Sequence, residues 1–257
     1  MSRQAAGNTG IAIKTAPEIA AMRTSGRLLA TVLQVVAARL GPGVATTELD
    51  ELAASEVQRL GGQAAFLGHH GFPKSICISV NEEVVHGIPG PRVIADGDVV
   101  GLDFGVRYDG LITDAATTVA VGAPRHDAQR LLVTTEQALQ AGIDQARAGQ
   151  RVGDISAAIE RHLRSAGLGI IRELTGHGVG RSLWEEPTVP NYGQAGHGPL
   201  LKPGMTLAIE PMATLGRPAV RVLADGWTIV ARDGSLAAQF EHTILITDGA
   251  AEILTTR

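Results

Sequence analysis

Two aspartates interrupt consecutive apolar runs in the stretch VVGLDFGVRYDGLITDAAT, residues 99–117. The Arg107–Gly110 segment between them has the composition of a turn, so the stretch predicts a β-hairpin. If all four of those residues form the loop, Asp103 lies directly opposite Asp114. If only Asp109-Gly110 turns, the two acids are diagonal neighbours on the same face. Either register puts the carboxylates roughly 4.5–8 Å apart.

This pairing of acids limits what the chain can fold into. Like charges so close destabilise a sheet unless a positive group lies between them, and no Lys or Arg occupies the strand interiors. A divalent cation is the natural counter-charge. The alternative is that one aspartate caps a turn while the other is solvated on an exposed face.

Composition narrows the class of protein. The chain has 257 residues, 44% hydrophobic and 19% charged, enough to bury the core of one large domain or two small ones. A net charge of −4 without basic blocks gives no electrostatic attraction to nucleic acid or to a membrane surface. The single cysteine, Cys77, excludes an intrachain disulfide framework, and no run of about 18 apolar residues could span a bilayer. We expect a soluble, cytoplasmic monomer with a flexible tail over residues 1–10.

Helical patterns occur in two similar pairs. A capping box at Thr15 and Glu18 predicts a helix through Leu40, followed by a second from about Thr47 to Leu60. A long helix from about residue 126 to 147 and a shorter one from about 154 to 165 repeat the arrangement. We therefore expect pseudo-repeats at about 15–122 and 124–247, with coincidental similarity between helical hairpins as the alternative.

Strand-like runs follow each pair of helices. They are expected at 75–80, 206–211, 226–231 and 239–247, besides the hairpin, whereas residues 84–89 lead into a turn-rich stretch. Helix pairs segregated from hairpins predict an α+β fold, with a mainly antiparallel sheet and the helices on one face.

Three further segments place an ionisable residue where the local pattern calls for apolar or small ones. They are TGHGVG, LAIEPM and AQFEHTIL, which contain His177, Glu210 and Glu241. Taken singly, these could be a loop histidine, a solvated acid at a strand end and an exposed strand acid. Together with Asp103 and Asp114 they form an oxygen-rich ligand set. That set suits one or two divalent metals better than a structural zinc, and so many carboxylates favour two ions.

Five separated segments resemble those of the type I methionine aminopeptidases. These are PKSICISVNEEVVHGIP, GLDFGVRYDGLITDAA, ELTGHGVG, LAIEPM and AAQFEHTIL, and their order and spacing match from about Ile11 to the C-terminus. The resemblance implies the pita-bread fold, in which two pseudo-symmetric helix-helix-strand halves surround a mainly antiparallel sheet. It also implies that residues 11–257 form a single catalytic domain.

The resemblance assigns roles to matching positions. It implies a dinuclear site that binds two divalent cations, of cobalt, manganese, iron(II) or zinc, with the following five ligands: Asp103, Asp114, His177, Glu210 and Glu241. Asp114 and Glu241 would bridge the ions, and Glu210 would also accept a proton. His86 matches a histidine that is not a ligand and lies near the scissile bond; without the resemblance it is most simply a turn histidine.

The substrate pocket departs from the family pattern. By resemblance it is lined by Phe66, His69, Phe72, Cys77, Leu183 and Trp227, of which Phe66, His69 and Leu183 differ from the usual Cys, Tyr and Phe. Trp184 also stands where the family has a second histidine, thought to contact the substrate carbonyl. An indole can donate one hydrogen bond but cannot take up a proton.

The leading hypothesis is therefore a metal-dependent aminopeptidase that removes N-terminal methionine from nascent chains and peptides, prefers small second residues and contacts the ribosome transiently. One alternative is a pita-bread peptidase of altered specificity, such as a prolidase relative, although those carry an extra N-terminal domain. Another is a weakly active or non-enzymatic binding homologue, because Trp184 replaces the expected histidine.

Overall fold

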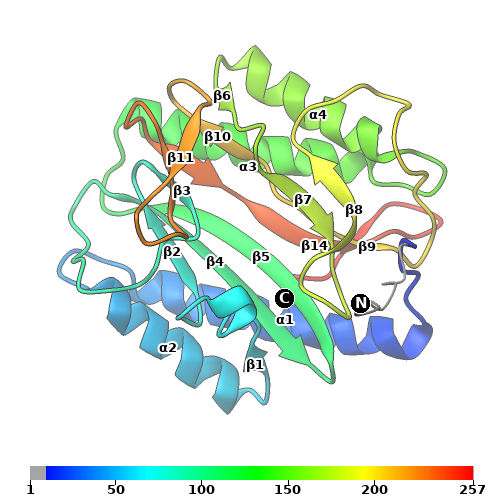
Figure 1. Cartoon of the computed structure of the whole chain (residues 1–257), viewed down its shortest axis with the longest axis horizontal. Coiled ribbons are helices and arrows are strands. Elements are labelled where there is room, and N and C mark those ends of the chain that lie inside the picture. The colour runs from blue at the N-terminus through cyan, green and yellow to red at the C-terminus, as the bar shows by residue number, and fades with distance from the viewer. Residues whose placement is uncertain (1–9, 257) are drawn as a thin grey trace, which may run out of the picture.

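A computed structural model describes residues 10–256 (Figure 1). Residues 1–9, which make up most of the expected tail, lie outside the described residues, as does residue 257. The four α-helices are α1 (Ala16–Arg39), α2 (Thr46–Arg59), α3 (His126–Gln145) and α4 (Val152–Ser165), and η1 (His69–Gly71) is a short 3₁₀ turn. The first strands are β1 (Gln63–Ala64), β2 (Cys77–Val80), β3 (Glu83–Val85), β4 (Val99–Tyr108), β5 (Leu111–Ala120), β6 (Gly169–Ile170) and β7 (Thr175–Gly178). The later ones are β8 (Glu185–Pro190), β9 (Thr206–Ile209), β10 (Met212–Thr214), β11 (Val220–Val222), β12 (Ile229–Ala231), β13 (Ala237–Gln239), β14 (Glu241–Leu245) and β15 (Glu252–Ile253).

The helices begin and end within a few residues of the expected positions. At the start of α1, the Glu18 carboxylate accepts hydrogen bonds from the backbone N–H of Thr15 at 2.7 Å and from its hydroxyl at 2.8 Å. These bonds satisfy groups that the first turn leaves without helical partners. α3 ends two residues before Arg147, and α4 begins two residues before Asp154.

The hairpin of β4 and β5 adopts the second of the two expected registers. Tyr108 lies opposite Leu111, so the loop is Asp109-Gly110 alone. Both loop residues have positive φ, 48° and 77°, as a two-residue turn that matches strand twist requires. Asp103 is therefore opposite Ala116 rather than Asp114, and the two acids are diagonal neighbours.

A nine-stranded sheet organises the molecule, and its core path is β1-β4-β5-β14-β9-β7-β8. Every pairing among the described strands is antiparallel, including those of β14 with β5 and with β9. Strand β14 thereby joins the strands that follow the first helix pair to those that follow the second. In Figure 1, α1 and α3 run behind these strands, and both helices contact the sheet.

Two of the predicted strands are broken in the structure. The strand expected at 239–247 divides at Phe240 into β13 and β14, which belong to different sheets. The strand expected at 206–211 ends at Ile209, and the chain resumes as β10 after Pro211. The expectation of single strands was wrong because the backbone crosses between sheets at both points, which local patterning does not reveal.

The strand expected at 226–231 begins only at Ile229. The residues before it form a turn, because the Asp225 carboxylate accepts hydrogen bonds from the backbone N–H groups of Trp227 and Thr228. The Trp227 side chain is thus carried on a tight connection between β11 and β12.

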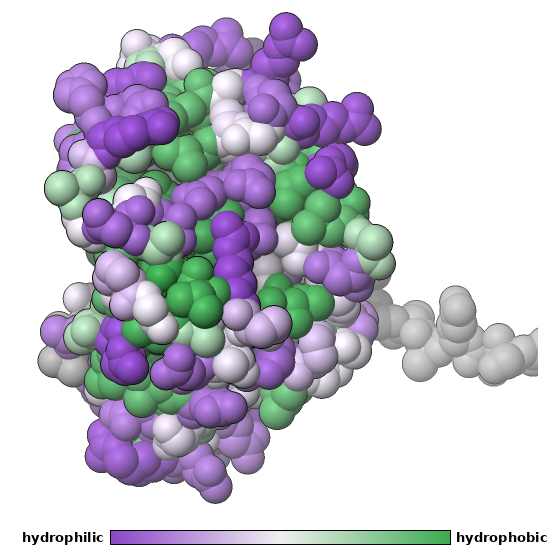
Figure 2. Space-filling view, turned by 90° about the vertical axis from the view of Figure 1, so that its left-hand side faces the viewer, coloured by the Kyte–Doolittle hydropathy of each residue, from purple (hydrophilic) through white to green (hydrophobic). Residues whose placement is uncertain are grey.

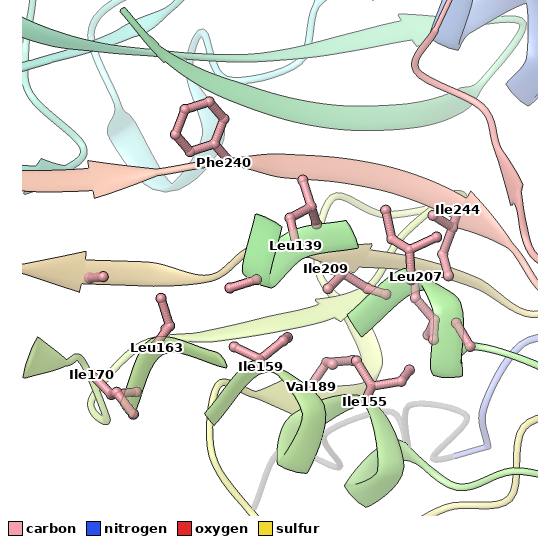
Figure 3. Packing of buried hydrophobic residues seen from close by; sticks show 14 of the residues in the cluster. Leu139, Ile155, Ile159, Leu163, Ile170, Val189, Leu207, Ile209, Phe240 and Ile244 are labelled. Carbon is pink, nitrogen blue, oxygen red and sulfur yellow. The ribbon is translucent and has the colours of Figure 1, made fainter. Parts of the chain in front are cut away.

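The back of the sheet is packed against α3 and α4. Figure 3 shows Leu139, Ile155 and Ile159 lying next to strand residues that include Leu207 and Ile209. Each such side chain contributes about 1.5–3 kcal/mol when fully buried. Ala208, between Leu207 and Ile209, belongs to a different cluster on the other face. This alternation leaves the front of the sheet for small and polar residues.

No helix within residues 10–256 is long and apolar enough to cross a membrane. Figure 2 shows the face that includes α2 and β3, where hydrophilic side chains dominate both ends and apolar ones are scattered between them.

Candidate active site

The adjacent strands β4, β5 and β14 bring three carboxylates together around the small residue Ala116. Ala116 of β5 lies opposite both Asp103 of β4 and Glu241 of β14. Residues in register across a sheet share a face, as do residues two apart along a strand, so Asp114 points the same way. The small Ala116 side chain leaves room for the three acids to converge above it.

His177 reaches the same place from β7. Its flanking glycines allow the strands to approach closely: a Cβ at Gly176 would lie 2.4 Å from the carbonyl oxygen of Ala208. The His177 Nδ1 lies 2.9 Å from the Gly178 carbonyl oxygen, which can only accept, so Nδ1 carries the proton. The unprotonated Nε2 faces the acids, 3.4 Å from Glu210 Oε1 and 4.0 Å from Asp114 Oδ2.

The break between β9 and β10 positions Glu210. Its backbone carbonyl accepts a hydrogen bond from the Asn191 side chain at 3.1 Å, and its Oε2 accepts one from Gln239 Nε2 at 3.2 Å. The free Oε1 is therefore the atom that faces His177.

Burial dominates the electrostatics of this cluster. It raises the pKa of Asp103 to about 7, while a hydrogen bond from Gln239 opposes the shift. Burial, followed by repulsion from neighbouring carboxylates, raises the pKa values of Asp114, Glu210 and Glu241 well above their ordinary range. Burial also lowers the pKa of His177 to about 4, so this imidazole is neutral at pH 7. The cluster thus lacks positive charge.

The donor set fits divalent metal ions. Three buried carboxylate oxygens, Asp103 Oδ1, Asp114 Oδ1 and Glu241 Oε1, have no hydrogen-bond partner. Ligand atoms of Asp114, His177 and Glu241 all lie within 4.8 Å of one another. Two ligands of one ion at metal–ligand distances of about 2.1 Å are themselves about 3.0–3.4 Å apart, close to the spacing of His177 and Glu210.

One cavity of about 460 Å³ contains all the predicted site residues. Within residues 10–256 its lining includes neither Lys nor Arg. The thirteen lining residues are the same thirteen that the sequence suggested: Phe66, His69, Phe72, Cys77, His86, Asp103, Asp114, His177, Leu183, Trp184, Glu210, Trp227 and Glu241. The structure thus brings every one of them together, and their individual roles remain predictions.

Apolar side chains line part of the same cavity. The Phe72 and Trp227 rings meet edge to face with centroids 5.2 Å apart, and Cys77 is buried and free. His86 approaches from the loop after β3 in the left-handed region, φ 59°, and burial lowers its pKa, which keeps its imidazole neutral.

Several supporting residues were missed in the sequence. Gln239 bonds to Glu210, and Thr243 exchanges hydrogen bonds with both backbone groups of Asp114. Both are polar residues in the apolar stretch around Glu241, a signal that could have found them. Lys14 forms an ion pair of 2.7 Å with Glu185, 171 residues away, and nothing in the local sequence indicates that contact.

Comparison with known proteins agrees with this geometry. Residues 20–248 match the model of metallopeptidase family M24. Methionine aminopeptidase 1 of Bacillus subtilis is 44% identical over 95% of this chain and 99% of its own length. The chain belongs to the methionine aminopeptidases of family M24. It is accordingly a metal-dependent hydrolase.

Solved structures show the same fold. The crystal structure of methionine aminopeptidase from Thermotoga maritima superposes with a TM-score of 0.95 and 44% identity, covering 96% of this chain and all of that one. Prolidase from Pyrococcus furiosus matches 95% of this chain but 65% of its own, with a TM-score of 0.77 and 21% identity. That likeness shows the pita-bread fold alone, and no finding supports the altered-specificity or non-enzymatic alternatives.

Proposed function

We propose that this chain removes N-terminal methionine from polypeptides at a dinuclear metal site formed by Asp103, Asp114, His177, Glu210 and Glu241. The observation that carries the proposal is the group of buried carboxylate oxygens without partners beside an unprotonated histidine nitrogen. Four ionised carboxylates carry a charge of −4, which two divalent cations neutralise. Asp114 and Glu241, at the middle of the group, are the proposed bridging ligands.

Divalent cations bound here supply Lewis-acid chemistry, which lowers the pKa of water and polarises a peptide carbonyl. Glu210 is the proposed proton acceptor, because Gln239 holds its Oε2 and leaves Oε1 facing the site. His86 lines the same cavity as a neutral imidazole, and its N–H is the proposed donor to the scissile amide.

The lining of the cavity suits the side chain and the free α-amine of an N-terminal methionine. The apolar part between Phe72, Cys77 and Trp227 would accommodate a thioether side chain, and a metal ion held by the acids would have an open position for the neutral α-amine. A second groove begins where the cavity opens and shares His86, His177, Trp184 and Glu210 with it. In this proposal the first residue of the substrate occupies the cavity and its later residues extend into the groove, which would limit hydrolysis to chain ends.

We assign the reaction to nascent chains in the cytoplasm, with transient ribosome contact and a monomeric enzyme as parts of the same proposal. The low content of cysteine and the unbiased charge support this location. The resident metal is cobalt, manganese, iron(II) or zinc, all of which accept oxygen-rich sites with one histidine.

Peptide hydrolysis with controlled metal content tests the function. Metal-stripped protein should be inactive, and each metal added back singly should restore release of methionine from Met-Ala peptides to a different extent. Peptides with Ala, Gly or Ser in second place should be cleaved faster than those with Leu or Lys. Release from an N-acetylated peptide would show that no free amine is bound, and faster cleavage of Met-Pro than of Met-Ala would favour a prolidase-like specificity.

A further inference from the structure

Three aromatic rings meet at the rim of the cavity. The Trp184 indole lies edge to face with His69, ring centroids 4.8 Å apart, and nearly parallel to His70, at 5.4 Å and 17°. Trp184 is 47% exposed and belongs to the loop between β7 and β8, whereas both histidines belong to η1 in the first half of the chain. This stack therefore joins two loops across the cavity mouth. His70 has no role in the proposed function.

Ion pairing and hydrogen bonds anchor the loop that carries Trp184, and His70 has an uncommon backbone conformation. Glu185, next to Trp184, pairs with the buried Lys14 and accepts hydrogen bonds from the backbone N–H groups of Arg181 and Ser182, at 2.6 and 3.0 Å. His70 has a φ of 48°, a left-handed conformation that residues other than glycine adopt only rarely. Its backbone is thus held in a conformation that presents the ring to the indole.

The indole stands at a passage that the substrate must cross. The cavity and the second groove, of about 460 and 1060 Å³, have four lining residues in common: His86, His177, Trp184 and Glu210. These four residues therefore lie where the two spaces adjoin. A peptide with its first residue in the cavity and its later residues in the groove places its second residue beside them. Trp184 has the bulkiest side chain of the four.

We propose that His70 is a positioning residue that, by stacking on Trp184, holds the indole beside the second residue of the substrate and so adds to the discrimination against bulky second residues. The inference rests on the proposed function, because it concerns the same site and reaction. Trp184 then strengthens this selection, and His70 acts only through it. Stacking of this kind changes the population of the stacked orientation of the Trp184 indole, relative to its other orientations, by about 2- to 10-fold.

The test compares two substitutions at His70 in the manganese-loaded protein. His70→Asn keeps a residue that tolerates positive φ and removes the ring, whereas His70→Phe keeps a ring that can stack. His126→Asn, at an exposed histidine on α3, is the control. The ratio of kcat/KM for a Met-Ala-Gly peptide to that for a Met-Val-Gly peptide should fall about 2- to 10-fold in His70→Asn. It should stay near the wild-type value in His70→Phe and in the control.

A spectroscopic readout isolates the stack from catalysis. The chain has two tryptophans, so a Trp227→Phe background leaves Trp184 as the only indole fluorophore. His70→Asn should increase acrylamide quenching of that indole, and His70→Phe should restore protection. An unchanged quenching constant, or increased quenching with an unchanged selectivity ratio, would overturn the inference. Absence of any methionine release by the parent protein would instead count against the proposed function, whatever the fluorescence shows.

Discussion

At the scale of single residues, the site depends on groups that would be costly without a cation. Asp114 is 4% exposed and Glu241 2% exposed, and each has a carboxylate oxygen without a hydrogen-bond partner. An unpaired buried charge is expensive, so such groups either bind protons or bind metal. Burial raises the pKa values of Asp114 and Glu241, so without metal these carboxyl groups favour the protonated form.

Asp114→Asn should abolish methionine release and weaken binding of at least one ion. The loss in affinity should exceed the roughly 10- to 100-fold typical of an outer partner, because the amide removes a charged ligand. Thr243→Val is a matched comparison, since the Thr243 hydroxyl bonds only to the backbone of Asp114 and its loss should fall within that range. Metal titration calorimetry with a parallel peptide assay measures both. Wild-type turnover by Asp114→Asn at full metal occupancy would contradict the dinuclear assignment.

Trp184→His should raise kcat more than it changes KM. A histidine at this position would donate to the substrate carbonyl mainly in the transition state, and one such donor is worth about 2.7–4 kcal/mol, or roughly 100- to 1000-fold in rate. An indole N–H supplies part of this, so Trp184→Phe, which keeps the ring without the donor, should be slower than the parent. Steady-state kinetics on a Met-Ala peptide measure kcat and KM separately for each variant. Lower or unchanged turnover in Trp184→His would mean that the loop suits a different substrate geometry.

At the scale of elements, the close approach of β7 to β9 controls where His177 lies. His177 is opposite Ala208, and the adjacent Gly176 leaves no space for a side chain against the Ala208 carbonyl. The interruptions between β9 and β10 and between β13 and β14 also position ligands. They place the carboxylates of Glu210 and Glu241 where two sheets meet.

Gly176→Ala should destabilise the fold by about 1–3 kcal/mol, because the new Cβ must push the two strands apart. The displacement of His177 should weaken metal binding as well. Gly41→Ala is the control, since no atom lies within 4 Å of its added Cβ. Urea unfolding measures the stability of both variants, and metal titration measures their metal affinity. Equal stability and metal affinity in the two variants would show that the strand spacing is not critical.

At the scale of the whole molecule, metal binding and pH are linked through the buried acids. The pKa of Asp103 is about 7 in the fold and near 3.8 in an unfolded chain, so between those values the folded protein binds more protons. Stability of the metal-free protein therefore falls as pH rises through this window. His177 acts oppositely, since its pKa of about 4 makes the stability it contributes disappear as pH falls below 6.5.

Four carboxyl groups with raised pKa values outweigh the opposite effect of one imidazole. The free energy of unfolding of metal-stripped protein should therefore decrease from about pH 5 to pH 8. Manganese should abolish that decrease, with a stabilisation of about 2.7 kcal/mol when its concentration is 100 times Kd. Thermal unfolding of stripped and loaded protein across this range measures the effect, and Asp103→Asn should flatten the stripped curve. Parallel curves for stripped and loaded protein would refute the linkage.

The sequence by itself determined the helices, the acid-bearing hairpin and the identity of the candidate site. Capping residues, turn pairs and acids in apolar runs act over a few residues, and their signals are therefore local. The pseudo-repeats at about 15–122 and 124–247 stay a prediction. Only the tertiary structure decided the hairpin register, the sheet changes at Glu210 and Phe240, and the reach of Lys14 to Glu185. These depend on contacts between residues far apart in the chain, whose free energies no local pattern encodes.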